Sequence, residues 1–557
     1  MKKISLALFI LLRTMTAGSQ SPFYHNPILA GFYPDPSICK VENDYYLINS
    51  SFAYFPGLPV FHSRDLVNWK LIGHAMNRPS QMNLEGAGVS RGLFAPTIRY
   101  HKGTFYIVCT LIDQIGNFVI TATDPAGPWS DPVALKEVNG IDPSLFFDED
   151  DRAWLTFNSI APDNKPLYDG HRTIRMVEFD WKNLKVIGKE EILINGGTDI
   201  LKRPVWIEGP HHFKKDGWYF LSCAEGGTAY QHSQVIFRSR SLHGPYHPWH
   251  KNPVLTQRHL NRNRPDPVTT TGHADLTQAP DGSWWAVFLG CRPYQGDFFN
   301  TGRETFLLPV KWEDGWPVIL EGTEQVALKA PTPAGALKVP GFYSGNFLYR
   351  DDFNDPAPDP RWIFLRTPLE KWHSLSDKKG WLTLQLREAT IEGKSNPSFM
   401  AQRQQHLTGE AQTLLSFKAQ SEKEKAGLLV FQNERHYFFL CQSLRSGKRV
   451  VELYQGPGKD GKEPVLLGYA FPEGKKHNLE LKVSFDSARY HFWYREEYTG
   501  WKIITDKPQD GTMLSTATAG GFVGTVIGLY AVSPDKAKNN KASFDYFQYM
   551  GDDSAYK

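Results

Sequence analysis

The sequence lacks the features that mark nucleic-acid-binding and membrane-spanning proteins. Lysine and arginine (62) nearly balance aspartate and glutamate (59), which leaves a formal net charge of +3 without a basic stripe. A nucleic-acid partner is therefore not expected. The apolar run at 4–12 is too short to span a bilayer. Because it follows two lysines and precedes small residues, it predicts a signal peptide over residues 1–20 and a periplasmic or secreted protein.

Cysteine is scarce and scattered. The five cysteines stand alone in apolar, strand-like segments, without a CxxC motif or a Cys/His cluster: Cys39, Cys109, Cys223, Cys291 and Cys441. This pattern excludes a zinc site or a redox motif of the usual kind. We expect buried free thiols. Amphipathic segments of helical length are missing as well, so a helical domain is not expected.

Aromatic residues (13%), 47 glycines and 38 prolines indicate a turn-rich all-β protein. Between residues 30 and 290 one pattern occurs five times: a small or acidic residue, an apolar strand, a polar turn and an aromatic strand. Each repeat then continues into a third strand. No such unit buries its own face, so we predict a five-bladed β-propeller. The repeats open at Asp35-Pro36-Ser37, Ala95-Pro96-Thr97, Asp142-Pro143-Ser144, Glu208-Gly209-Pro210 and Gly272-His273-Ala274.

The chain is too long for a single core, and its texture changes after the repeats. A stretch rich in alanine, proline and glycine follows Gln325, and short alternating strands resume from Tyr349. We therefore predict a propeller over 21–326, a linker over 327–348 and a β-sandwich over 349–557.

Three of the five repeats open with a carboxylate, at Asp35, Asp142 and Glu208. Equivalent positions of propeller blades face one axis, so these side chains are expected to meet. Paired carboxylates suit glycoside cleavage, in which one acid protonates the leaving oxygen and another acts on the opposite side of the sugar. Crowding separates their pKa values, which keeps one of them protonated. Taken singly, each aspartate before proline could instead cap a turn.

The motifs as a set resemble glycoside hydrolase family 43. The resemblance covers nearly the whole chain, and its sandwich resembles the C-terminal domain of that family's β-xylosidases, which is lectin-like (concanavalin A-like). The segments that carry it are 26–37, 51–57, Ala95-Pro96, 208–211, 224–228, 272–274 and 302–305. The resemblance implies an inverting mechanism with Asp35 as general base, Glu208 as general acid and Asp142 as the residue that raises the pKa of Glu208 and orients it.

The resemblance also implies five substrate-binding residues: Phe52, Phe94, His273, Arg303 and Phe522. Relatives often have tryptophan at the position of Phe94, which leaves the choice of sugar open. An ion pair with Glu304 or a neighbour is the alternative for Arg303, and a satisfied core histidine is the alternative for His273. Phe522 lies between glycines that permit a tight loop, either reaching into the propeller pocket or filling an interface. A closed pocket would restrict the enzyme to terminal sugars.

No cofactor is expected for the reaction. Asp352 and Asp545 lie where related lectin-like domains hold a structural calcium with oxygen ligands. Acidic residues at strand ends are common, so an ordinary surface role remains the alternative.

The main hypothesis is an exo-acting xylan 1,4-β-xylosidase that removes terminal non-reducing β-D-xylose from xylo-oligosaccharides. An α-L-arabinofuranosidase acting on arabinan or arabinoxylan side chains is the alternative within the family. A retaining, invertase-like enzyme would need an Asn-Asp-Pro-Asn context and a Glu-Cys pair, whereas Asp35 follows Pro34 and Glu208 precedes Gly209. A non-catalytic carbohydrate-binding propeller is a remote alternative. The sequence does not predict an oligomeric state.

Overall fold

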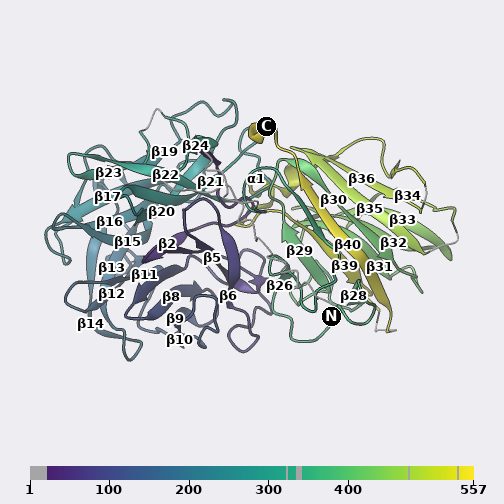
Figure 1. Cartoon of the computed structure of the whole chain (residues 1–557), viewed down its shortest axis with the longest axis horizontal. Helices are drawn as coiled ribbons and strands as arrows, with labels where there is room; N and C mark the ends of the chain where they lie inside the picture. Colours follow the sequence, from purple (N-terminus) through teal and green to yellow (C-terminus); the bar gives the residue numbers. More distant parts are fainter. Residues whose placement is uncertain (1–21, 322–323, 334–340, 475–476, 498, 536–538) are drawn as a thin grey trace, which may run out of the picture.

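The computed structural model describes residues 22–321, 324–333, 341–474, 477–497, 499–535 and 539–557. The predicted signal peptide (1–20) lies outside these residues. Figure 1 shows two β-rich bodies side by side, the first half of the chain in one and the last part in the other. Helical structure in the described residues is limited to α1 (Thr516–Ala519) and the 3₁₀ turns η1 (Pro162–Asn164), η2 (Ile200–Lys202), η3 (Gly511–Leu514) and η4 (Ser554–Tyr556). No helix in this part of the chain is long and apolar enough to cross a membrane.

The first body consists of five antiparallel sheets, one for each sequence repeat. Blade 1 contains β2 (Ser37–Val41), β3 (Asp44–Ile48), β5 (Gly57–Ser63) and β6 (Lys70–Met76). Blade 2 contains β7 (Thr97–His101), β8 (Thr104–Leu111), β9 (Gly116–Ala122) and β10 (Val133–Ala134). Blade 3 contains β11 (Ile141–Phe147), β12 (Ala153–Ile160), β13 (Arg172–Asp180) and β14 (Lys185–Asn195). Blade 4 contains β15 (Glu208–Lys215), β16 (Trp218–Glu225), β17 (Ser233–Ser239), β18 (His247–Pro248) and β19 (Leu255–Thr256). Blade 5 contains β20 (Thr269–Gln278), β21 (Trp284–Cys291), β22 (Glu304–Glu313) and β23 (Trp316–Val318).

The innermost strands of the blades form a closed ring. Strands β2, β7, β11, β15 and β20 each pack beside the next, and β20 returns to β2. Apolar clusters fill the spaces between neighbouring blades, with Leu47 and Trp285 in one and Phe220 and Phe288 in another. Each blade therefore depends on its neighbours for burial, as repeat architectures do. The predicted five-bladed propeller is confirmed.

The sequence pattern showed three strands in each repeat, whereas each blade has at least four. The missed strands are the outer ones, and two of them, β10 and β18, have only two residues each. In β14 most side chains are exposed or half-exposed. Outer strands of this kind lack the apolar alternation by which a half-buried strand is predicted from sequence.

The second body is a sandwich of two large antiparallel sheets. One sheet contains β25 (Leu348–Asp351), β27 (His373–Ser374), β28 (Leu382–Gln385), β30 (Thr408–Ser416), β35 (Asn478–Asp486), β36 (Arg489–Arg495), β37 (Lys502–Ile503), β38 (Gln509–Asp510) and β40 (Lys541–Gly551). The other contains β26 (Ile363–Leu365), β29 (Phe399–Arg403), β31 (Lys425–Asn433), β32 (His436–Arg445), β33 (Lys448–Gln455), β34 (Val465–Ala470) and β39 (Val526–Val532), and is completed by β4 (Tyr54–Phe55) from the propeller. The predicted β-sandwich is confirmed.

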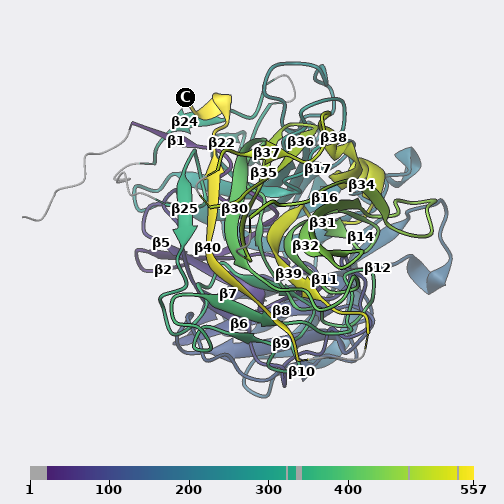
Figure 2. The ribbon, with the colours of Figure 1, turned by 90° about the vertical axis from the view of Figure 1, so that its right-hand side faces the viewer.

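The two bodies share secondary structure as well as a core. Strand β4 pairs with β26, with Phe55 opposite Phe364. The stretch 327–348 was expected to be a linker, but part of it is a strand. Strand β24 (Lys329–Pro331) runs antiparallel to β1 (Phe23–His25) and pairs with it. Figure 2 shows the C-terminus beside these two strands, and the Tyr556 hydroxyl donates to the carbonyl oxygen of Asn26 at 3.1 Å.

Candidate active site

The three predicted acids lie at corresponding ends of the innermost strands of blades 1, 3 and 4. Asp35 precedes β2, Asp142 is the second residue of β11, and Glu208 begins β15. Each residue is buried, with 6–7% of its surface exposed. The carboxylates of Asp35 and Asp142 both act electrostatically on Glu208. The structure therefore brings the three acids together at the hub, on one end of the ring of inner strands.

The backbone at this end repeats a left-handed residue from blade to blade. The φ angle is 52° at Asp35, 54° at Asp142, 56° at Gly209 and 53° at His273. This conformation costs a residue other than glycine about 1–3 kcal/mol, and it persists where the surroundings hold it. Blade 4 has glycine at the left-handed position, so its acid, Glu208, stands one residue earlier than the aspartates. The irregular register of the glutamate therefore has a backbone cause.

Neighbouring groups hold Asp35 and Asp142 in place. The Ser50 hydroxyl donates to Oδ2 of Asp35, and Nδ1 of His273 lies 3.7 Å from Oδ1 of the same carboxylate. The backbone N–H of Gly209 donates to Oδ2 of Asp142 at 3.2 Å. A Cβ at Gly209 would approach the His273 ring to 2.8 Å, so the blade 4 turn also requires glycine for space.

The electrostatics of the site favour a protonated Glu208. Burial raises the pKa of Glu208 well above its ordinary value, and the charges of Asp142 and Asp35 raise it further. Burial also raises the pKa of Asp142, against the lowering effect of nearby His273. A buried acid that keeps its proton, beside carboxylates anchored by hydrogen bonds, can donate a proton while another carboxylate accepts one.

Three phenylalanine rings from the two domains form an aromatic cluster beside Arg303. The Phe522 ring stacks on Phe52 with centroids 5.9 Å apart and meets Phe94 edge to face at 6.2 Å. The guanidinium of Arg303 lies 4.9 Å from the centroid of the Phe522 ring. The Arg303 charge lowers the pKa of Glu208, which places that guanidinium on the site. The sandwich thus supplies one ring of this aromatic cluster, and closure of the pocket by Phe522 stays a prediction.

The loop that carries Phe522 is fixed by backbone contacts with the propeller. The Phe522 N–H donates to the Ser90 hydroxyl at 2.9 Å, and the Thr525 N–H donates to the Asn300 carbonyl oxygen at 2.8 Å. A Cβ at Gly524 would come within 2.4 Å of the Thr301 carbonyl oxygen, so only glycine permits this approach. Hydrogen bonds and close packing therefore hold this loop against the propeller.

The alternative ion pair of Arg303 with Glu304 is wrong. The Glu304 carboxylate binds Arg292, with the Nε of Arg292 at 2.7 Å, and both side chains are buried. Arg303 instead donates to the Thr228 carbonyl oxygen at 3.4 Å. The five cysteines are buried free thiols, as expected.

The calcium site predicted from Asp352 and Asp545 stays a prediction. The Asp352 carboxylate accepts a hydrogen bond from Arg350 at 2.7 Å, and its charge raises the pKa of Asp545, which burial raises most. Among the residues that the structure describes, no group of three or more His, Cys, Asp or Glu side chains is placed to hold a metal ion.

Sequence reasoning missed several residues that shape the site. Arg99 and Asp275 form a partly buried ion pair at 2.9 Å that links the innermost strands of blades 2 and 5. Arg172 lies near the acids: burial lowers the pKa of its guanidinium, and the charges of Glu208 and Asp142 raise it. Trp206, whose ring lies 4.6 Å from the Arg172 guanidinium, stands two residues before Glu208. The position of Trp206 two residues before Glu208 was the one sequence signal that could have pointed to this group, because Arg172 lies in no recognisable motif.

Comparison with known families identifies both domains. A family model described as glycosyl hydrolases family 43 matches residues 24–317. A second, described as the beta xylosidase C-terminal concanavalin A-like domain, matches residues 350–550.

Individual relatives match along the whole chain. A protein of Butyrivibrio fibrisolvens named xylosidase/arabinosidase is 38% identical over 531 residues, which cover 94% of this chain and 98% of the relative. A non-reducing end alpha-L-arabinofuranosidase of Bacteroides ovatus is 37% identical over 534 residues, 94% of each chain. Among solved structures, the xylan beta-1,4-xylosidase of Bacillus halodurans C-125 has a TM-score of 0.85 and 32% identity, covering 95% of this chain and 100% of that one.

Proposed function

The chain belongs to glycosyl hydrolase family 43, and from this premise we propose that it removes terminal, non-reducing β-D-xylose from xylo-oligosaccharides with inversion at the anomeric carbon. The resemblance seen in the sequence is thereby confirmed at the level of the family and of a glycoside hydrolase. The observation that carries the proposed chemistry is the buried Glu208, whose pKa is raised by burial and by two neighbouring carboxylates.

In this mechanism Glu208 donates its proton to the glycosidic oxygen as the bond to the anomeric carbon breaks. Asp35 takes a proton from a water molecule, which attacks the anomeric carbon from the opposite face. Asp142 keeps the pKa of Glu208 high and, through Gly209, fixes the start of β15. Electrons and protons balance, because one proton enters the leaving group and one leaves the water.

The variant Glu208→Gln tests the acid role, because an amide cannot donate the proton. We expect turnover of unactivated xylo-oligosaccharides to fall by about 10²–10⁴-fold, with a modest change in substrate binding. Unchanged turnover would remove Glu208 from this role and would revive the alternative of a non-catalytic carbohydrate-binding propeller. Proton NMR of the first-formed sugar tests inversion, since a retained anomer would contradict the single displacement.

An α-L-arabinofuranosidase is the second candidate, because the relatives carry both names. The protein of Butyrivibrio fibrisolvens is named for both sugars and that of Bacteroides ovatus for arabinose alone. Parallel kcat/KM measurements on the 4-nitrophenyl β-D-xyloside and α-L-arabinofuranoside separate the two. Both assignments fail if neither substrate is cleaved.

Export to the periplasm or beyond, predicted from residues 1–20, belongs to the same proposal. Fractionation of cells that express the full chain or a form without residues 2–20 would test it. We expect activity to move into the cytoplasm when the segment is removed.

A further inference from the structure

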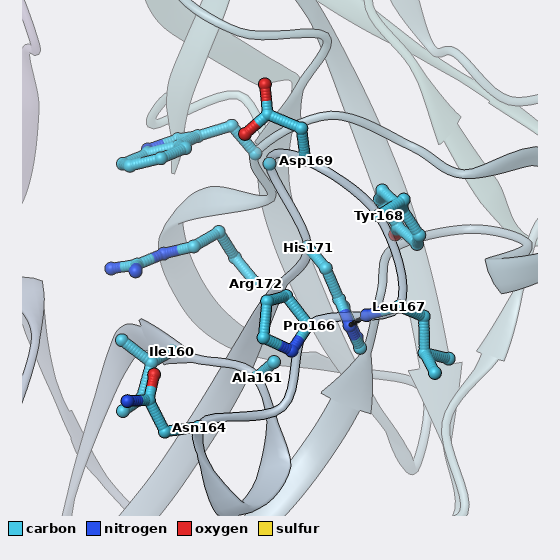
Figure 3. A pocket seen from close by; sticks show the side chains of 11 residues that line it. Ile160, Ala161, Asn164, Pro166, Leu167, Tyr168, Asp169, His171 and Arg172 are labelled. Carbon is cyan, nitrogen blue, oxygen red and sulfur yellow. Dashed lines mark hydrogen bonds between the residues drawn. The ribbon is translucent and has the colours of Figure 1, made fainter.

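A hollow of about 420 Å³ lies on blade 3, beside the hub. Figure 3 shows it between the end of β12, the loop that follows and the start of β13, with Ile160, Asp169 and Arg172 around it. Trp206, from the segment that leads into Glu208, completes the lining. Its size falls within the range of about 300–1,000 Å³ that is usual for small-molecule sites. It therefore offers room for more than one sugar unit.

Arg172 is held rigidly at the hub side of this hollow. Its Nε and Nη2 donate to Oδ1 of Asn158 at 3.1 and 2.7 Å, and its guanidinium lies 4.6 Å from the centroid of the Trp206 ring. The Asn158 amide in turn donates to the carbonyl oxygen of Ile207. Within the described part of the chain, Nη1 of Arg172 has no hydrogen-bond partner. A fixed guanidinium with a free donor suits recognition of hydroxyl oxygens.

The hollow lies on the side of the site where the leaving group must be. The general acid protonates the oxygen of the leaving sugar, so that sugar lies against Glu208. Trp206 lies next to the Glu208 carboxyl, and the charge of Glu208 acts on Arg172. A chain that leaves the hub past Glu208 therefore enters the hollow that Arg172 and Trp206 border.

We propose that this hollow binds the leaving part of the oligosaccharide over more than one sugar, and that Arg172 is the residue that makes the enzyme favour longer leaving groups. This inference rests on the proposed glycosidase function. Arg172 supplies hydrogen-bond donors, the Asp169 carboxylate supplies acceptors, and Trp206 and Ile160 supply apolar surface for the ring faces. A polar pair beside an aromatic surface is the composition expected for a neutral, hydroxyl-rich ligand.

The test compares Arg172→Met with the matched control Arg152→Met. Arg152 belongs to the same blade, lies 4.7 Å over the Trp154 ring and binds Glu178, so it has a similar setting away from the acids. Values of kcat and KM are measured for xylobiose, xylotriose, xylotetraose and the 4-nitrophenyl xyloside, whose leaving group is small and not a sugar. Thermal unfolding of both variants verifies that they are folded.

For the wild type we expect kcat/KM to rise from xylobiose to xylotriose. In Arg172→Met that rise is expected to disappear, with about a tenfold or greater loss on xylotriose, mostly in KM, and no more than about a threefold loss on the 4-nitrophenyl xyloside. Arg152→Met should match the wild type on every substrate. Equal losses on all substrates, mainly in kcat, would show that Arg172 supports Glu208 instead and would overturn the inference. The inference would also be overturned if the kcat/KM of the wild type did not change with the length of the oligosaccharide.

Failure of the proposed function gives a different result. In that case the wild type cleaves no xyloside. The loss of kcat/KM caused by Arg172→Met is then measured on arabino-oligosaccharides and compared with its loss on the 4-nitrophenyl arabinofuranoside. A selective loss on the oligosaccharides would support the hollow as a leaving-group site for that sugar, and an equal loss would overturn it.

Discussion

The backbone N–H of Gly209 donates to Oδ2 of Asp142 at 3.2 Å, which ties the turn after the buried Glu208 to the carboxylate of the preceding blade. The same carboxylate raises the pKa of Glu208 through its charge. Asp142 therefore has two effects on one residue, a positional effect through a hydrogen bond and an electrostatic effect through its charge. An amide at this position separates the two, because its oxygen still accepts the hydrogen bond.

The variant Asp142→Asn is expected to move the alkaline limb of the kcat/KM profile to lower pH. Removing a negative charge makes ionisation of Glu208 easier, so its pKa falls and the protonated form is lost at lower pH. The measurement is kcat/KM between pH 4 and 9 on a xyloside. Asp148→Asn, at a carboxylate that accepts from the Tyr219 hydroxyl at 2.8 Å, is the control and should keep the wild-type limb. A slower enzyme with an unmoved limb would show that Asp142 acts by position alone.

Glu208→Gln is expected to stabilise the fold at alkaline pH. The pKa of Glu208 is raised in the folded protein, so as pH rises the unfolded chain ionises first and the native state loses stability until its own pKa is passed. Near the ordinary glutamate pKa of about 4.3 this cost is small, and it grows toward pH 8. Tm is measured for the wild type and the variant at both pH values. A gain at pH 8 that shrinks near pH 4 is expected, and a loss at pH 8 would contradict the buried, protonated acid.

Most of the architecture and the acids could be predicted because both recur along the chain. An acid opens three of the five repeats, and equivalent strand starts converge in a ring. The displaced Glu208 could be seen, but its cause could not, because only the backbone shows that Gly209 takes the left-handed position.

Other parts depend on contacts between distant segments. Nothing around Arg172 distinguishes it from an ordinary strand start, and its approach to Glu208 follows from the packing of blade 3 against blade 4. Likewise, Tyr54 and Phe55 complete a sheet of the other domain by pairing with residues more than three hundred positions away. The Arg292–Glu304 pair shows the same limit, since adjacency in sequence suggested Arg303 instead.

Phe522→Ala is expected to lower kcat/KM on the 4-nitrophenyl xyloside by about tenfold to a hundredfold. The variant removes the ring that packs on Phe52 and Phe94 and lies beneath Arg303. The remaining groups then lose their fixed positions, and a misplacement of about 1 Å can cost about 10²-fold in rate. Phe471→Ala is the control, because that ring is 45% exposed on the sandwich. If Phe522→Ala retains wild-type kcat/KM while its Tm falls, Phe522 only fills the interface.

The C-terminal tail provides the last prediction, a test of how the domains are joined. Asp553 is 4% exposed and binds Nη1 of Arg292 at 2.8 Å. Its carboxylate also accepts hydrogen bonds from the backbone N–H groups of Leu407 and Thr408. The neighbouring Asp552, by contrast, binds Lys557 at 2.8 Å on the surface. Arg292 keeps Glu304 in Asp553→Ala, but the N–H groups of Leu407 and Thr408 lose their acceptor. Because each buried donor left unsatisfied costs about 1–3 kcal/mol, the variant should lower the free energy of unfolding by about 2–4 kcal/mol. Asp552→Ala should change it by at most about 1 kcal/mol. Denaturant unfolding measures both, and equal small losses would mean that the tail does not hold the propeller to the sandwich.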